Sequence, residues 1–504
     1  MTASSLNTGA ATVYSRRAFT VTQRVCGVMG ATAMATGLFQ LIALGADPWV
    51  SILAVGTVFA ALLPIWVYGV GRSIGVFFLF VCCYWGLNAL VVKSVLLQPL
   101  DSYLYTPVLS HLIVFIAISG SSLGAVLARP LMQVVPQIRW PAATPSFLRS
   151  VSQASLVIGI LGLVLSRLGG GAQALSIFLS SYFILAFSAE CARELLLTQG
   201  RRHISVFGVV IAALLMLVSL ASNSKFGIMA IPLAYVVTVF AFGGRFRVSH
   251  AVLGVVAAIF LSSVVFPAIT FIARSDRNQV SATQLVSNTF VAMQNLATGD
   301  EAVRVQLEAR EARNARAGGW RYDVPYQRHV PLIFERFLLV PFVDAVARRL
   351  SVSGPFAGTS FITSQLANTL PAFINPNKVE AYSGNEIVVS LRLADSGFAG
   401  FPTMGWPAEA FYAGNLSFVF LSSIAVFFLF SLALSVTIGR TAGNIFAVFI
   451  VTRYFHLLTC GVFSNFAYFT IRQLPVDLLL FGVMILIARW RGLGVTPSAY
   501  GPGR

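Results

Sequence analysis

Charged side chains are scarce in this chain of 504 residues: Asp, Glu, Lys and Arg make up only 10% of it, whereas 57% of the residues are hydrophobic. Ordinary soluble domains contain about 25% charged residues, so the composition excludes a water-soluble globular protein. The mean hydropathy is +0.82, and the apolar runs are continuous. Because these runs do not alternate between polar and apolar residues, they predict an all-α polytopic membrane protein and not a membrane β-barrel.

Cysteine is also rare, and the hydrophilic part of the chain has none. The chain has five cysteines, all within apolar segments: Cys26, Cys82, Cys83, Cys191 and Cys460. This distribution suggests neither a disulfide framework nor a zinc site. A Gly-rich phosphate loop and a nucleophile elbow are absent as well. We therefore expect no metal and no cofactor.

Twelve apolar windows approach the length of about 20 residues that a helix needs to cross a bilayer. We expect each of them to be a transmembrane helix. The windows are 25–45, 49–70, 74–97, 107–128, 151–167, 174–196, 204–222, 227–242, 251–273, 416–438, 443–463 and 474–488.

Acidic residues are nearly missing from the membrane part. Residues 274–415 carry 13 Lys and Arg and 12 Asp and Glu, whereas the rest of the chain carries 21 Lys and Arg but only 5 Asp and Glu. The basic excess therefore lies on the connections between apolar segments. This placement follows the positive-inside rule and does not suggest a nucleic-acid-binding surface, which needs a basic soluble face.

The basic residues follow every second apolar segment, which predicts a multi-pass membrane protein with both termini in the cytoplasm. The predicted organisation is a cytoplasmic tail (1–24), nine helices (25–273), a large outer loop (274–415), three helices (416–488) and a second cytoplasmic tail (489–504). The cations that set this orientation are Arg16, Arg17, Arg24, Arg72, Arg129, Arg139, Arg149, Arg201, Arg202, Arg245, Arg247, Arg440, Arg489 and Arg491.

Seven other cations fall on the predicted outer side or within a helix: Lys93, Arg167, Lys225, Arg274, Arg277, Arg453 and Arg472. A charge near the bilayer centre costs at least about 2.5–3.5 kcal/mol, so Arg453 requires a partner. Asp477 of the last helix is one candidate partner, and a bound anion is the other. For the cations at helix ends, snorkelling to lipid phosphates is the alternative to anion binding. Diphosphate suits Arg and Lys through charge-assisted hydrogen bonds.

The outer loop is expected to be helical and irregular. Residues 281–297 and 300–317 have helical patterns, and the apolar stretch 331–350 reads as two short interfacial helices divided at Pro341. Between residues 320 and 329, aromatic side chains are interspersed with charged ones, among them Arg328. This pattern suits either the binding of sugars or the packing of the loop on its own membrane base. Glu409 is expected to open the helix that begins near residue 416. The helix dipole would favour its carboxylate there, or Glu409 would deprotonate an acceptor hydroxyl.

Two short segments resemble a known family. The turn Ser222-Asn223-Ser224-Lys225 and the segment Pro402…Glu409-Ala410-Phe411-Tyr412…Gly414 before a helix resemble Wzy-type oligosaccharide repeat-unit polymerases, which are related to O-antigen ligases. The chain departs from the family at the turn, which carries Lys225 where the family usually has Arg.

The resemblance implies a GT-C-like glycosyltransferase architecture and an inverting, metal-independent glycosyl transfer at the outer face of the bacterial inner membrane, so that the outer loop would be periplasmic. The implied substrate is a polyprenyl-diphosphate-linked oligosaccharide within the membrane lipids, and a chain-length regulator protein is a candidate partner. Candidates for activating the acceptor are Glu409 and His329. Candidates for binding the diphosphate are Lys225, Arg274, Arg277, Arg328, Arg348, Arg392 and Arg453.

Two alternatives remain at this point. One is a ligase that transfers a finished glycan to another acceptor. The other is a flippase or transporter, although ion-driven transporters usually place carboxylates within their helices. Here only Glu190, Glu194 and Asp477 lie in or beside the apolar windows, and no internal repeat is evident.

Overall fold

The computed structural model consists of helices and their connections, with no β-strand, in the part of the chain that it describes. An isolated antiparallel bridge joins Arg72 and Arg440. The described residues are 3–166, 171–221, 225–244, 260, 264–265, 268, 282–298, 305, 338–353, 356–370, 374–375, 383–394, 404–459 and 461–490.

Seven helices in these described ranges are long and apolar enough to cross a membrane: Thr20–Ile42, Pro48–Tyr68, Ser73–Val95, Pro107–Val134, Pro145–Leu165, Leu416–Thr437 and Phe463–Trp490. Three shorter apolar helices accompany them: Val206–Leu220, Gly227–Ala241 and Ile445–Phe455. The protein is thus an all-α membrane protein, as the composition predicts, and the predicted number of twelve spans stays a prediction. The predicted helix 174–196 is divided at Ser181, and 251–273 lies almost wholly outside the described residues.

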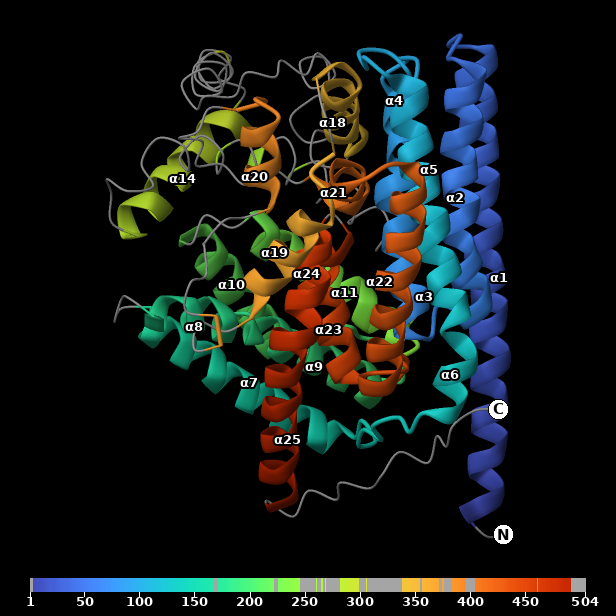
Figure 1. Cartoon of the computed structure of the whole chain (residues 1–504). Coiled ribbons are helices and arrows are strands. Elements are labelled where there is room, and N and C mark those ends of the chain that lie inside the picture. The colour runs from blue at the N-terminus through green and yellow to red at the C-terminus, as the bar shows by residue number, and fades with distance from the viewer. Residues whose placement is uncertain are drawn as a thin grey trace.

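The N-terminal helices line one edge of the molecule. Helices α1 (Ala3–Ile42), α2 (Pro48–Tyr68) and α5 (Pro107–Leu127) lie side by side there (Figure 1). The third span is continuous but contains a π-helical turn, so it consists of α3 (Ser73–Val81), η1 (Cys82–Leu87) and α4 (Asn88–Val95). Helix α1 begins within the predicted N-terminal tail.

Helix α5 packs closely along α22 (Leu416–Thr437). Gly120 and Gly124 face the backbone of Phe420 and Ile424, and a methyl group added at either glycine would overlap a carbonyl oxygen of α22. Small residues at such a spacing let two membrane helices approach backbone to backbone. The first and last thirds of the chain therefore meet in one tightly packed helix pair.

The rest of the membrane body packs through aromatic side chains. Helices α7 (Pro145–Leu165), α9 (Tyr182–Leu197), α23 (Ile445–Thr459) and α25 (Leu474–Trp490) come together in this region. Two other helices, α10 (Val206–Ala221) and α11 (Lys225–Ala241), pack on α9, and α8 (Gly171–Ser180) packs on α7.

The hydrophilic stretch contributes α14 (Ala282–Ala297), α18 (Val340–Ser353), α19 (Thr359–Thr369), α20 (Ser383–Ser390) and α21 (Gly405–Ala413). Most of them gather at the end of the bundle where α4 lies (Figure 1). Helix α14 confirms the helix predicted at 281–297. The second of the two helices predicted in 331–350 is present as α18, and Pro341 lies in its first turn, where a missing N–H costs no intrahelical bond. Residues 331–337, where most of the first helix is predicted, lie outside the described part. The predicted helix 300–317 lies outside the described part except for Val305, which is helical.

Candidate functional site

Glu409 lies in the middle of α21, a helix outside all candidate membrane spans. The sequence predicts that Glu409 opens the following membrane helix, and this placement is wrong. Gly414 is extended and Asn415 caps α22 through a hydrogen bond from the N–H of Phe418 at 3.0 Å. A short break therefore separates α21 from α22.

The carboxyl group of Glu409 is completely buried. Its Oε2 accepts a short hydrogen bond from the backbone N–H of Phe463, whereas its Oε1 has no hydrogen-bond partner among the residues that the structure describes. Burial raises the pKa of Glu409 to about 8; the Phe463 N–H acts against this shift, and the nearby Glu386 carboxylate adds to it. A buried carboxyl group with one unpartnered oxygen and a pKa near neutrality is a candidate for proton transfer.

Glycine and tryptophan at the start of α21 explain why the helix sits at this position. Gly405 has a φ of 74°, which L side chains rarely adopt, and a Cβ there would overlap the ring of Trp85. The next residue, Trp406, is fully buried and contacts Trp85 edge-on with ring centroids 5.4 Å apart. Trp406 also packs against Phe427 of α22 at 5.0 Å. These contacts fix α21 against η1 and α22.

A second carboxylate lies close to Glu409. Glu386 of α20 accepts a hydrogen bond of 2.5 Å from Gln365 of α19. Burial raises the pKa of Glu386, and the bond from Gln365 lowers it. Ser390 and Tyr412 share a hydrogen bond of 2.7 Å that joins α20 to α21. Glu386 and Gln365 were not among the predicted site residues, because the turn-forming letters around Ser383-Gly384-Asn385 concealed the start of a helix.

The structure describes only some of the predicted cations. The guanidinium of Arg348 stacks on the ring of Tyr105, with Cζ 3.6 Å from the centroid, and makes no hydrogen bond or ion pair with the described residues. Arg392 is exposed just after α20, with a φ of 53°. Lys225 is the first residue of α11. The other predicted residues lie outside the described part: Arg274, Arg277, Arg328 and His329.

Arg453 is paired inside the membrane body. Its Nη1 lies 2.8 Å from Oδ1 of Asp477, which also accepts a bond of 2.7 Å from Tyr182. The second carboxylate oxygen accepts from Tyr454 at 2.7 Å. This is the protein partner that the sequence offered as one of two explanations for Arg453. Because Asp477 supplies its counter-ion, we leave Arg453 out of the proposed diphosphate site.

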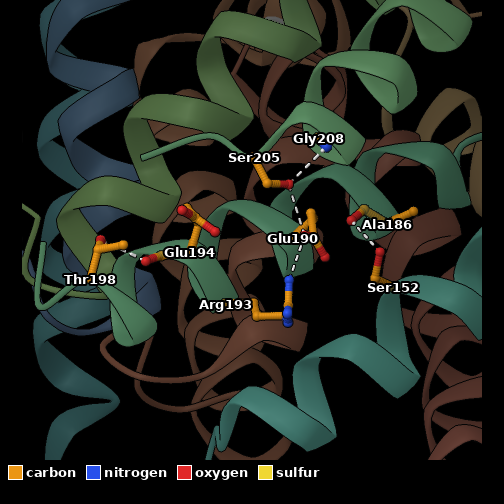
Figure 2. A network of polar contacts seen from close by, with 8 residues as sticks. All are labelled: Ser152, Ala186, Glu190, Arg193, Glu194, Thr198, Ser205 and Gly208. Atoms are coloured by element: carbon orange, nitrogen blue, oxygen red, sulfur yellow. Dashed lines mark hydrogen bonds and ion pairs between the residues drawn. The ribbon is translucent and has the colours of Figure 1, made fainter. Parts of the chain in front are cut away.

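Glu190 of α9 is the centre of a separate polar network (Figure 2). It forms an ion pair of 2.8 Å with Arg193 and accepts a bond of 2.8 Å from Ser205, which in turn accepts from the N–H of Gly208 at 3.0 Å. Ser152 donates to the carbonyl of Ala186 at 3.1 Å in the same view. The network joins α9 to the start of α10, so we assign it a structural role.

Within the described ranges, no group of three His, Cys, Asp or Glu side chains lies close enough together to hold a metal ion. Comparison of the chain with protein-family models, with curated proteins and with solved structures finds no match. The class of the protein therefore rests on its composition and fold, and its activity is a matter for proposal.

Proposed function

We propose that the protein is a membrane glycosyltransferase that polymerises polyprenyl-diphosphate-linked oligosaccharide units at the outer face of the bacterial inner membrane. The proposal combines the resemblance of two segments to Wzy-type polymerases with the surroundings of Glu409. It requires that α18, α20 and α21 face the periplasm, as the distribution of cations predicts.

The observation that carries the proposal is the buried Glu409 with its unpartnered Oε1. In the proposed reaction this oxygen takes the proton of an acceptor hydroxyl. The hydroxyl oxygen then forms a bond to the anomeric carbon of the donor sugar from the face opposite the diphosphate. The bond from that carbon to the diphosphate oxygen breaks, and the lipid diphosphate leaves with the bonding electrons.

The departing diphosphate gains negative charge, so cations near it lower the barrier. Arg348 suits this role, because its guanidinium is held on the ring of Tyr105 and its N–H groups have no acceptor among the described residues. Arg392 and Lys225 remain candidates, as do the three arginines outside the described part. With a pKa of about 8, Glu409 is mostly protonated at neutral pH, so the rate should rise with pH up to that value.

The test is a purified, reconstituted protein supplied with a lipid-diphosphate-linked repeat unit. We expect chains of several units from the wild type, at least about 100-fold less product from Glu409→Gln, and loss of the rise in rate with pH. Ser422→Ala, on the neighbouring α22, is the matched control and should retain activity. A Glu409→Gln protein that is folded and as active as the wild type would contradict the proposal.

Deleting the gene separates the alternatives in cells. Surface glycan reduced to single repeat units supports a polymerase. Loss of attached glycan with free polymer remaining would indicate a ligase instead. Accumulation of lipid-linked units inside the cell would indicate a flippase.

A further inference from the structure

Two connections at the end of the bundle opposite α18 are tied together through their backbones. The connection between α2 and α3 pairs with the one between α22 and α23 at the bridge from Arg72 to Arg440. The N–H of Ser73 donates to Gly439 O at 3.1 Å, and the N–H of Thr441 donates to Gly71 O at 3.0 Å. The two arginines are therefore neighbours on a rigid backbone.

A third connection, which follows α5, joins this pair. The hydroxyl of Tyr68 donates to Ala125 O at 2.6 Å, close to Arg129 at the start of α6 (Arg129–Val134). Further along, Trp140 Nε1 donates to Thr437 O at 2.8 Å. Three separate parts of the chain thus converge here, each fixed by hydrogen bonds that do not involve the arginine side chains.

These three connections carry positive charge and no acidic side chain of their own. Residues 69–73, 128–144 and 438–444 contain no Asp or Glu. Arg72 is half-buried, and its pKa is lowered by burial and by the positive charges of Arg440 and Arg129. None of the three guanidinium groups has a hydrogen bond or ion pair with a residue that the structure describes. Bringing unpaired like charges together costs free energy unless an anion binds between them.

We propose that Arg72, Arg129 and Arg440 form a binding site for the phosphate group of an anionic membrane lipid. The positive-inside rule accounts for arginines on these connections, but it does not require that they converge. Arginine is suited to phosphate because its fork of N–H groups matches two oxygens. Basic sites between membrane helices bind lipid headgroups in the same way.

The apolar surface next to the arginines favours a lipid over a soluble phosphate compound. Trp66 and Leu127, at the ends of α2 and α5, are 55% and 50% exposed, and Leu131 of α6 is 45% exposed. These side chains lie within one turn of Tyr68 or Arg129 along their helices. Acyl chains of a lipid whose phosphate is held by the arginines would cover them.

The experiment uses the full chain in lipid nanodiscs. Wild-type protein in phosphatidylcholine is titrated with phosphatidylglycerol, and binding is followed by the shift in thermal unfolding and by native mass spectrometry. We expect the Arg72→Gln/Arg440→Gln protein to bind phosphatidylglycerol at least roughly tenfold more weakly. Arg489→Gln, an exposed arginine of α25 outside this group, is the matched control and should bind like the wild type.

Two further arms complete the test. Arg129→Gln, which changes an exposed side chain and no backbone contact, replaces the double variant if the latter is not monodisperse in phosphatidylcholine, and should weaken binding roughly fivefold. Inorganic phosphate should give no shift. The proposal is overturned if the variants bind phosphatidylglycerol as tightly as Arg489→Gln does, or if inorganic phosphate stabilises the wild type as well as the lipid does. The proposal is independent of glycosyl transfer, since it concerns the other end of the bundle.

Discussion

The carboxylate of Asp344 binds both the backbone N–H and the hydroxyl of Thr106, at 2.7 and 2.8 Å, across 238 positions of the chain. It also accepts from the N–H of Tyr105 at 2.9 Å and from the hydroxyl of Ser110 at 2.9 Å. A residue of the hydrophilic stretch thus caps the N-terminus of membrane helix α5, where the helix dipole favours a negative charge. Arg348, one turn later in α18, stacks on Tyr105. These contacts fix α18 to the bundle.

Replacing Asp344 with alanine should loosen this attachment. The N–H groups of Tyr105 and Thr106 would lose their acceptor, and the hydroxyls of Thr106 and Ser110 would keep only their bonds to each other and to Thr106 O. We therefore expect a loss of about 3 kcal/mol in the free energy of unfolding and faster hydrogen exchange in α18. Thermal unfolding in nanodiscs and exchange mass spectrometry measure the two effects. Glu194→Ala removes a carboxylate that has no hydrogen bond with the described residues and serves as the control. Equal stability of the two variants would contradict the capping role.

Glu409 should make the protein less stable as the pH rises. Its pKa of about 8 in the folded protein lies above the ordinary value of 4.5, so the folded state holds a proton that the unfolded state has released between these values. The stabilisation is complete below about pH 4.5 and is lost as the pH approaches 8. We expect Glu409→Gln to remove this contribution. Unfolding measured from pH 5 to pH 9 for both proteins gives the difference, and parallel curves would show that Glu409 does not titrate in this range.

Gly405 and Gly443 form a matched pair for testing why α21 lies against Trp85. Both have positive φ values, 74° and 69°, but only Gly405 has a neighbour that an added methyl group would overlap. Gly443→Ala should cost about 1 kcal/mol for the backbone conformation alone. Gly405→Ala should cost about 1–3 kcal/mol more, because the Trp85 ring must move. Thermal unfolding compares the two, and an equal loss would mean that this contact does not hold α21.

The pair of Arg453 and Asp477 should show strong coupling. Arg453→Met leaves a buried carboxylate without its cation, and Asp477→Asn leaves a buried guanidinium without its anion, so each single change should cost about 3–5 kcal/mol. The double variant should lose less than the sum, because no unpaired charge remains. A double-mutant cycle measured by denaturant unfolding gives the coupling. Additive losses would indicate that the tyrosine hydroxyls alone satisfy Asp477.

Much of the membrane body could be predicted from the sequence, because long apolar runs must form helices in lipid. The seven long helices fall on predicted windows, and Asp477, one of the two partners considered for Arg453, is the one that the structure shows. The predicted window 174–196 failed at one point, since Ser181 separates α8 from α9. A break of one residue does not alter hydropathy, so a window of about 20 residues does not detect it.

The site was less predictable, because it depends on contacts between distant parts of the chain. Glu409 was singled out, but nothing in its neighbourhood in the sequence indicates that Phe463, 54 positions away, donates to it. The role of Asp344 was equally hidden, since its partners are backbone groups at the start of α5. Local patterns predict helices, whereas capping and burial across the chain follow only from the packed structure.

The close contact of Gly120 and Gly124 with α22 has a mechanical consequence. Two helices whose backbones touch cannot slide or rotate independently, so α5 and α22 should move together as one rigid unit. One end of this unit is capped by Asp344, and the chain passes from α21 to α22 through Gly414 and Asn415. Any motion that moves α21 away from this unit must therefore bend the chain at these two residues and separate the rings of Trp406 and Phe427.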